Sequence, residues 1–256
     1  MRPCLKAPLR VRGVEYGGPK PLFCVPLAAA NLEDLLRQAR IAHDLAPDLV
    51  EWRADFYQDL DRIIESLQQV RTILVNEPVI FTLRIREEGG AQEIPGDFRR
   101  SCIEAVASSG GADMIDVELC NGAPFLKSVL SAAHARGVRT ILSFHDFEQT
   151  PATEELLRLL EKMNRHGADV AKIAVMPREP EDVLRLLETT LEARNRFPQL
   201  GLSTTSMGRT GILSRVAGFL FGSDMAYAVA SESSAPGQIP IAEARAITEK
   251  LFAGDD

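Results

Sequence analysis

The chain has 256 residues, of which 45% are hydrophobic, and its formal net charge at pH 7 is −7. This charge argues against a general nucleic-acid binder, and no apolar run reaches the roughly 18 residues that a membrane-spanning helix needs. The four cysteines lie far apart and only four histidines occur, so the sequence predicts reduced thiols in a cytoplasmic protein and no metal centre.

The first predicted barrel strand lies in residues 21–30, "PLFCVPLAAA". This segment follows basic residues and ends in alanines, so it also fits the core of a signal peptide. The glycines and prolines of "GVEYGGPKP" before it, and a helical pattern directly after it, favour an internal strand. Residues 9–18, "LRVRGVEYGG", predict a small β-hairpin that would close the bottom of a barrel.

Helical patterns alternate with the apolar runs. "NLEDLLRQARIAH" begins with a capping Asn31, and "TPATEELLRLLEKMNRHG" offers Thr150 as a cap, Pro151 at the first helical position and Gly167 as its stop. "PGDFRRSCIEAVASSGG" and "PFLKSVLSAAHARG" also end in glycine. These boundaries predict separate helices, each placed between two apolar runs.

Eight short apolar runs recur at intervals of roughly 30 residues, the length of one βα unit. Continuous apolar strands that alternate with helices predict a parallel sheet covered on both faces. We find no linker, so we predict one α/β domain over residues 1–256 with a (β/α)8 TIM-barrel fold; a doubly wound open sheet is the second choice. The runs begin at Leu22, Leu49, Val79, Met114, Thr140, Val170, Leu200 and Met225.

Polar side chains share one face of six predicted strands near their carboxyl ends. Side chains alternate along a strand, and the outer face of a barrel strand packs against helices, so the polar face should point inward. Barrel active sites lie at this end of the strands. The polar residues of any single strand can be explained as a structural ion pair. Polar faces on six strands together favour a functional site. The groups are Glu51 with Arg53, Thr82 with Arg84, Asp116 with Glu118, Ser143 with His145, Lys172 with Ala174, and Ser203 with Thr205 and Met207.

Lys172 stands inside the apolar run "VAKIAVM", where an ionised lysine is costly unless it is paired. Burial and the arginines of neighbouring strands would lower its pKa, and a neutral lysine attacks a ketone to form a Schiff base. The iminium makes the neighbouring C–H acidic. His145 is then the natural general base, with Glu51 or Glu88 to orient its ring. The pattern predicts aldol cleavage or loss of water from a β-hydroxy ketone.

Two further segments add groups suited to ligand binding. "SMGRTGILSRVAG", residues 206–218, runs from the seventh strand into a helix that carries Arg215. "SESSAPGQIP", residues 231–240, follows the eighth strand and offers Ser234 and Gln238. Both follow barrel strands, where active-site loops occur. The alternatives are that the first segment only caps a helix and that the second is only a solvated turn.

Seven motifs together make the sequence resemble the type I 3-dehydroquinate dehydratases, the Schiff-base enzymes of the shikimate pathway. The resemblance implies dehydration of 3-dehydroquinate to 3-dehydroshikimate by a cytoplasmic homodimer, with no metal and no organic cofactor. It covers the chain from the second strand to the end of the eighth. The motifs are "EWRAD", "FTLR" followed by "EEGG", "IDVEL", "SFHDFEQTP", "ADVAKIAVMP", "SMGRTGILSR" and "SAPGQIP".

The resemblance also implies a role for each motif residue. Lys172 would form the Schiff base with the C3 carbonyl. His145 would remove a C2 proton and then help the C1 hydroxyl leave as water. Glu88 would partner the histidine, and Arg215 would pair with the substrate carboxylate. The other implied substrate-binding residues are Glu51, Arg53, Arg84, Met207, Ser234 and Gln238, with Asp116 and Glu118 beneath them and a contact from Tyr227.

Two other functions compete with this one. A class I aldolase would bind a sugar phosphate with the loops after the last two strands, and "MGRTG" allows that interpretation. It would hold the anion with backbone N–H groups, whereas a dehydratase would use Arg215. A barrel that serves only as a binding scaffold would tolerate loss of the lysine or the histidine, and both are present.

Overall fold

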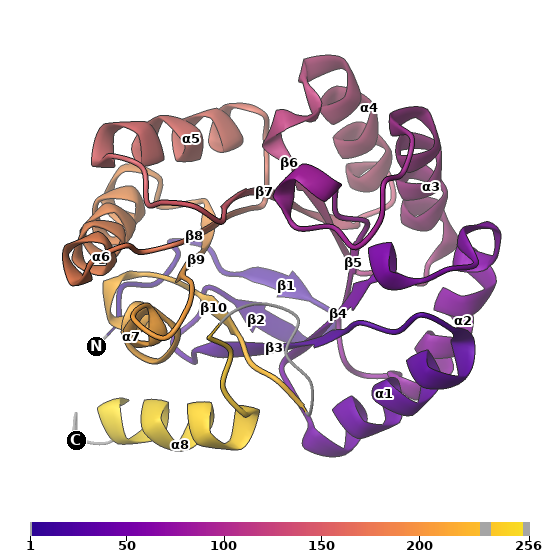
Figure 1. The fold of residues 1–256 in the computed structure, drawn as a ribbon, viewed down its shortest axis with the longest axis horizontal. Coiled ribbons are helices and arrows are strands. Elements are labelled where there is room, and N and C mark those ends of the chain that lie inside the picture. The colour runs from indigo at the N-terminus through magenta and orange to yellow at the C-terminus, as the bar shows by residue number, and fades with distance from the viewer. Residues whose placement is uncertain (1, 231–236, 253–256) are drawn as a thin grey trace.

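The computed structural model describes residues 2–230 and 237–252. Eight parallel strands form one sheet that curls into a barrel with helices around it (Figure 1). This confirms the predicted (β/α)8 fold over the open sheet, and each strand begins within one residue of its predicted start. The strands are β3 (Leu22–Leu27), β4 (Leu49–Arg53), β5 (Val79–Thr82), β6 (Met114–Glu118), β7 (Arg139–Asp146), β8 (Val170–Val175), β9 (Gly201–Ser206) and β10 (Met225–Tyr227).

The helices cover the outer face of the barrel, where they bury one face of every strand. Trp52, Val117 and Ile173 point outward and are at most 1% exposed within the main apolar core. The outer face of the strands therefore supplies apolar packing against the helices, and the inner face can hold polar groups. The helices are α1 (Leu32–Leu45), α2 (Ile63–Ile73), α3 (Gly96–Ser109), α4 (Ala123–His134), α5 (Thr153–Arg165), α6 (Pro180–Arg196), α7 (Ile212–Ala217) and α8 (Ile241–Phe252).

The predicted helix boundaries are confirmed in one case and corrected in another. The Asn31 side chain caps α1 by accepting a hydrogen bond from the Asp34 amide at 3.0 Å. The prediction for α5 is wrong, because this helix begins at Thr153 after Ala152, without a side-chain cap. The Thr150 hydroxyl instead donates to the Met176 carbonyl at 3.1 Å. It therefore ties the loop after β7 to the end of β8.

The predicted N-terminal hairpin is confirmed as β1 (Leu9–Val11) and β2 (Val14–Tyr16), and it lies across the barrel in Figure 1. Tyr16 at its end is fully buried. Its ring belongs to an apolar cluster in the barrel interior, with residues from the amino ends of the strands such as Leu49, Ile80 and Ile141. The hairpin thus closes the bottom of the barrel with apolar contacts, and the polar groups lie above this layer.

Asp224 joins the two ends of the sheet, β9 and β10. Its carboxylate accepts hydrogen bonds from the Leu202 amide at 2.8 Å and from Arg194 of α6 at 2.5 Å, and it also pairs with Arg2. Its own amide donates to the Leu202 carbonyl at 2.7 Å. One buried carboxylate therefore connects the last strand, the strand before it, a helix and the N-terminal segment.

Candidate active site

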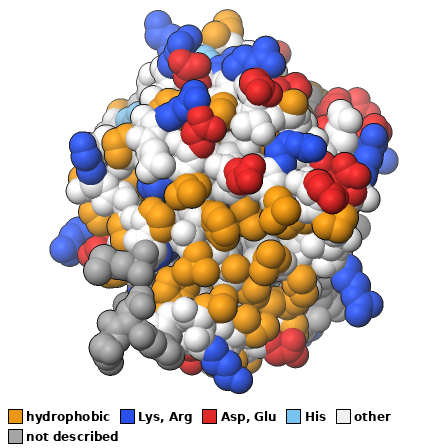
Figure 2. All heavy atoms as spheres, turned by 90° about the vertical axis from the view of Figure 1, so that its left-hand side faces the viewer, with side chains coloured by type: hydrophobic (Ala, Val, Ile, Leu, Met, Phe, Trp, Pro, Cys, Tyr) orange, Lys and Arg blue, Asp and Glu red, His pale blue; other side chains and the backbone are white. Residues whose placement is uncertain are grey.

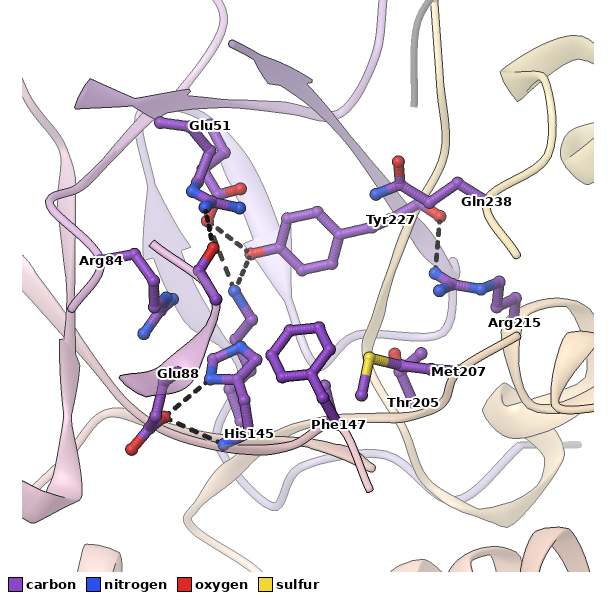
Figure 3. A pocket seen from close by; sticks show the side chains of 14 residues that line it. Glu51, Arg84, Glu88, His145, Phe147, Thr205, Met207, Arg215, Tyr227 and Gln238 are labelled. Atoms are coloured by element: carbon purple, nitrogen blue, oxygen red, sulfur yellow. Dashed lines mark hydrogen bonds and ion pairs between the residues drawn. The ribbon is translucent and has the colours of Figure 1, made fainter. Parts of the chain in front are cut away.

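One cavity at the carboxyl ends of the strands collects several of the polar side chains that the alternation pattern placed on inner faces (Figure 3). Strands β4, β5, β7, β8, β9 and β10, or the loops that follow them, contribute lining residues, so residues far apart in sequence meet there. The predicted inward direction of the polar faces is confirmed. The lining residues are Glu51, Arg53, Arg84, Glu88, Gly89, His145, Phe147, Lys172, Ala174, Thr205, Met207, Arg215, Tyr227 and Gln238.

Lys172 lies at the base of this cavity and is 7% exposed. Its Nζ donates to Asp116 Oδ2 at 2.8 Å and to the Tyr227 hydroxyl at 2.9 Å, and it lies 3.4 Å from Glu51 Oε1. The nitrogen is also 4.3 Å from the centre of the Tyr227 ring. A buried ammonium is stable only with such partners. The lysine in the apolar run is thus paired and faces the cavity.

Asp116 belongs to a buried chain of charges beneath the lysine. Arg84 contacts Asp116 at 2.8 Å and Glu118 at 3.0 Å, and it donates to the Ser143 hydroxyl at 2.6 Å. Burial alone would raise the pKa of Asp116, but Arg84 and Lys172 outweigh it and hold that pKa far below its usual range. Asp116 is therefore a fixed anion, and Arg84 holds it in place.

His145 and Glu88 form the second polar unit of the cavity. Glu88 Oε2 lies 2.9 Å from His145 Nδ1 and also accepts the backbone N–H of His145 at 2.9 Å. Glu51 and Glu88 were the two carboxylates predicted to orient the His145 ring. The structure pairs Glu88 with the ring, while Glu51 contacts Thr82 at 2.8 Å. Nδ1–H directed at Glu88 leaves Nε2 as the basic nitrogen of a neutral ring.

Burial shifts the pKa values of both members of this pair. It lowers the pKa of His145 well below its usual value, and the cations Arg84 and Lys172 act in the same direction. Burial raises the pKa of Glu88 to about 7, against the opposing effect of Arg84. A neutral imidazole beside a carboxylate that titrates near neutrality is suited to proton transfer at physiological pH.

Two adjacent glycines bring Glu88 to the histidine. Glu88 ends a 3₁₀ turn, Arg86–Glu88, and Gly89 follows with a φ of +86°, a conformation that favours glycine. A Cβ on Gly90 would lie 2.3 Å from the Arg84 carbonyl oxygen, so the chain can fold back over Arg84 only without a side chain there. The glycines of "EEGG" are thus required by the site.

Arg53 is held by a residue that sequence reasoning did not single out. Its Nε and Nη2 donate to the two carboxylate oxygens of Asp55 at 2.8 Å each, and Nη2 also donates to the Gly89 carbonyl at 3.0 Å. Burial opposes the charge on Arg53, but Asp55 outweighs it and raises the arginine pKa. The signal was present in "EWRAD", where an acid follows the arginine by two positions.

Phe147 is a lining residue of the cavity that sequence reasoning missed. Its ring stacks near the His145 ring, with 6.4 Å between centres and 16° between planes, and 39% of the residue is exposed. Figure 3 shows it beside the histidine at the cavity. An aromatic residue two positions after the histidine in "SFHDFEQTP" was the available signal.

The opposite wall carries Arg215 from α7, Met207 after β9, and Gln238 from the segment after β10. Arg215 is 2% exposed, and burial lowers its pKa to about 10. Its Nη1 donates to the Tyr227 carbonyl at 3.4 Å. Figure 3 shows Arg215 and Gln238 facing one another at this wall. The guanidinium is the cation of this side of the cavity.

The chain returns to the cavity through close backbone contacts. The Val229 amide donates to the Ile239 carbonyl at 2.9 Å. A Cβ on Gly237 would lie 2.3 Å from the Gly208 carbonyl oxygen, so these two loops approach directly. This approach places Gln238 over the site. Ser234, the other predicted residue of this loop, lies outside the described residues.

Within residues 2–230 and 237–252, no group of three or more histidine, cysteine, aspartate or glutamate side chains is arranged to hold a metal ion. In the same residues, none of the helices combines the length and the apolar character required to cross a membrane.

A buried lysine, a histidine–carboxylate pair and an arginine line one cavity at the carboxyl ends of the barrel strands. This arrangement is typical of the active site of a (β/α)8-barrel enzyme. The sequence profile described as "Type I 3-dehydroquinase" matches residues 23–255. The 3-dehydroquinate dehydratase of Bacillus licheniformis is 43% identical over 250 residues, covering 96% of this chain and 98% of that protein. That of Geobacillus thermodenitrificans is 41% identical over 252 residues, covering 96% and 97%.

Solved structures agree with the sequence relatives. The crystal structure of 3-dehydroquinate dehydratase from Geobacillus kaustophilus superimposes with a TM-score of 0.95 at 39% identity and covers 100% of both chains. The type I enzyme from Clostridium difficile, solved with covalent modified comenic acid, has a TM-score of 0.91 at 35% identity and covers 95% and 97%. The chain belongs to the type I 3-dehydroquinase family, and it is an enzyme of the hydro-lyase class.

Proposed function

We propose that this chain dehydrates 3-dehydroquinate to 3-dehydroshikimate, in the shikimate pathway, through a Schiff base on Lys172. One observation carries the proposal: the Lys172 amine lies in a cavity that also presents the His145–Glu88 pair. The names of the relatives support the substrate. The Clostridium difficile relative, which was solved with covalent modified comenic acid, supports the proposal of covalent chemistry.

The reaction can be written with these groups alone. The neutral amine of Lys172 attacks the C3 carbonyl, and the carbinolamine takes back the proton that the lysine had given up and loses water to leave a protonated imine. His145 Nε2 removes a proton from C2, and the electron pair of that C–H bond enters the imine to give an enamine. The enamine expels the C1 hydroxyl, which takes the proton from His145 and leaves as water. Hydrolysis of the remaining imine releases the product and restores the lysine.

The walls of the cavity supply the substrate contacts of this proposal. Arg215 pairs with the substrate carboxylate, a match that a guanidinium makes with two parallel hydrogen bonds. A buried side-chain cation at this place supports the dehydratase over the sugar-phosphate aldolase, for which we expected backbone N–H groups. The other proposed substrate-binding residues are Glu51, Arg53, Arg84, Met207, Ser234 and Gln238.

The homodimer, the cytoplasmic location and the single domain over residues 1–256 also remain proposals. Figure 2 shows a broad apolar area on the side of the barrel formed by α6, α7 and α8. A contiguous apolar area of this kind marks an interaction surface. We call it the α6–α8 surface and propose a second copy of this chain as its partner. Its exposed residues are Leu184, Leu191, Ile212, Leu213, Leu220, Ile247 and Leu251.

Borohydride trapping tests the proposed function. The protein is incubated with 3-dehydroquinate and borohydride, which reduces a Schiff base to a stable amine, and peptides are then mapped by mass spectrometry. We expect the mass of substrate or its dehydrated product on Lys172. Lys172→Ala should abolish trapping and turnover, whereas Lys127→Ala, at an exposed position of α4, should leave both unchanged. A folded protein that traps nothing on Lys172 would refute the Schiff-base proposal.

A further inference from the structure

Tyr227, the last residue of β10, places a hydroxyl group between the lysine and a carboxylate. Its oxygen accepts a hydrogen bond from Lys172 Nζ at 2.9 Å and donates one to Glu51 Oε1 at 3.3 Å. Figure 3 shows the ring reaching across the cavity with its hydroxyl directed at Glu51. The residue is 7% exposed. The three groups therefore form a continuous line of hydrogen bonds inside the barrel.

The ring and the hydroxyl of Tyr227 make different contacts with Lys172. The ring faces the ammonium, with 4.3 Å between Nζ and the ring centre, a contact that any aromatic ring would make. The hydroxyl adds the 2.9 Å hydrogen bond to Nζ and the link to Glu51. Packing alone does not require that oxygen, since a phenyl ring would fill the same volume. The hydroxyl therefore calls for a chemical explanation.

A lysine nucleophile must lose a proton before it can attack a carbonyl, because an ordinary lysine is protonated at neutral pH. Asp116 is the nearest carboxylate, at 2.8 Å, but Arg84 and Lys172 hold its pKa far below the usual range, so it is a poor proton acceptor. Glu51 lies 3.4 Å from Nζ. The Tyr227 hydroxyl contacts both groups, at 2.9 Å from Nζ and 3.3 Å from Glu51 Oε1, and so offers a second route between them.

We infer that the Tyr227 hydroxyl carries the proton of Lys172 to Glu51, and so prepares the neutral amine for Schiff-base formation. The inference rests on the proposed function. Nζ gives its proton to the phenolic oxygen while the phenolic O–H proton passes to Glu51. The products are a neutral amine, an unchanged tyrosine and a protonated Glu51. The reverse transfer returns the proton when the carbinolamine loses water, and hydrolysis of the protonated imine at the end of the cycle restores the lysine as an ammonium.

The electrostatics of the tyrosine agree with this role. Burial, followed by the charge of Glu51, raises the pKa of Tyr227 well above its usual value. The phenol therefore does not remain ionised, and it passes a proton on rather than releasing one. The hydroxyl also fixes the direction of Nζ, because the amine is held between Asp116 and Tyr227.

Tyr227→Phe tests the inference, because it removes the oxygen and keeps the ring. The rate of borohydride trapping with 3-dehydroquinate is measured in single-turnover experiments between pH 6 and pH 10, together with kcat and KM. We expect trapping at neutral pH to slow by about tenfold to a hundredfold, the kinetic equivalent of one hydrogen bond to a charged group. The difference in trapping rate between the variant and the parent should shrink as pH rises, because hydroxide then deprotonates the lysine. KM should change much less than kcat.

Tyr57→Phe is the matched control, since the Tyr57 hydroxyl is also buried and contacts the Ser66 hydroxyl at 2.9 Å, outside the cavity. It should leave the trapping rate and its pH profile unchanged. Glu51→Gln should reproduce the defect of Tyr227→Phe, and the double variant should be no slower than the slower single variant, because both act on one transfer.

Three outcomes would overturn the inference. The first is a Tyr227→Phe trapping rate within twofold of the parent at every pH. The second is a deficit that is constant across pH, as a purely structural loss would give. The third is a raised KM with kcat unchanged, which would make the hydroxyl a substrate contact. If the parent protein traps nothing on Lys172, the proposed function fails instead, and that result is distinct from all three.

Discussion

Glu88 and His145 work as one unit, because the protonation of the carboxyl decides which ring nitrogen carries the proton. An ionised Glu88 accepts from Nδ1–H and leaves Nε2 basic. A protonated Glu88 would donate to Nδ1 instead, which places the ring proton on Nε2 and removes the base from the cavity. The His145 and Glu88 side chains are only 9% and 7% exposed, so their environment sets this balance. The activity should therefore follow the titration of Glu88.

We predict that kcat/KM for 3-dehydroquinate rises with pH through a midpoint of about 7, the pKa to which burial raises Glu88. The sign follows from the tautomer, since the ionised carboxylate is the active form. Glu88→Gln should remove this rise and lower kcat by about a hundredfold or more, as loss of an orienting carboxylate does. A pH–rate profile of both proteins checks this. A rise near pH 7 that persists in the variant would assign it to another group.

At the scale of elements, the loop after β5 determines where the carboxylate of the pair lies. The 3₁₀ turn Arg86–Glu88 and the two glycines after it fold the chain back over Arg84. The Gly90 amide donates to the Ile85 carbonyl at 2.8 Å, which closes the turn. The turn also brings the Gly89 carbonyl to Arg53 at 3.0 Å. One small turn therefore positions groups on two sides of the cavity.

We predict that Gly90→Ala lowers kcat by about tenfold to a hundredfold, because a displacement near 1 Å at a reacting group has effects of that size. The new Cβ would lie 2.3 Å from the Arg84 carbonyl oxygen, so the turn and Glu88 must shift. Gly96→Ala is the control, since a Cβ there meets nothing within 4 Å. Steady-state kinetics of the two variants test this, and equal rates would show that the turn absorbs the methyl group.

At the scale of the molecule, the barrel separates packing from chemistry. The hairpin and the amino ends of the strands form an apolar floor, the carboxyl ends form the polar cavity, and the helices cover the outside. The α6–α8 surface differs from the rest of the helical layer because its apolar residues face outward. It includes Ile212 and Leu213 of α7, the helix that also carries Arg215. An interface here would support a wall of the site.

We predict that the parent protein is a dimer in light-scattering measurements and that Leu213→Arg shifts it toward monomer. Leu213 is 47% exposed, and a buried, unpaired guanidinium in an apolar interface is strongly unfavourable. Val75→Arg is the control, because Val75 is 56% exposed but follows α2, outside the α6–α8 surface. A parent protein that is monomeric at micromolar concentration would refute the proposed partner.

Much of the fold followed from periodicity. The eight strand starts, the N-terminal hairpin and the Asn31 cap depend on local patterns, and local patterns are visible in a sequence. The cap of α5 was assigned wrongly because Thr150 has a distant partner, the Met176 carbonyl, that competes with capping. The alternation of side chains also predicted several of the residues that line the cavity, although Phe147 at the cavity and Asp55, which holds Arg53, escaped notice.

The sequence by itself determined the barrel, the inward direction of the polar ring and, by resemblance, the family. Tertiary structure alone decided the pairings: Glu88 rather than Glu51 beside His145, Asp116 and Tyr227 beside Lys172, and Arg84 between two carboxylates. The physical reason is that alternation along a strand is a property of neighbouring residues. The distance between side chains on different strands depends on register, loop path and burial, which only the folded chain sets.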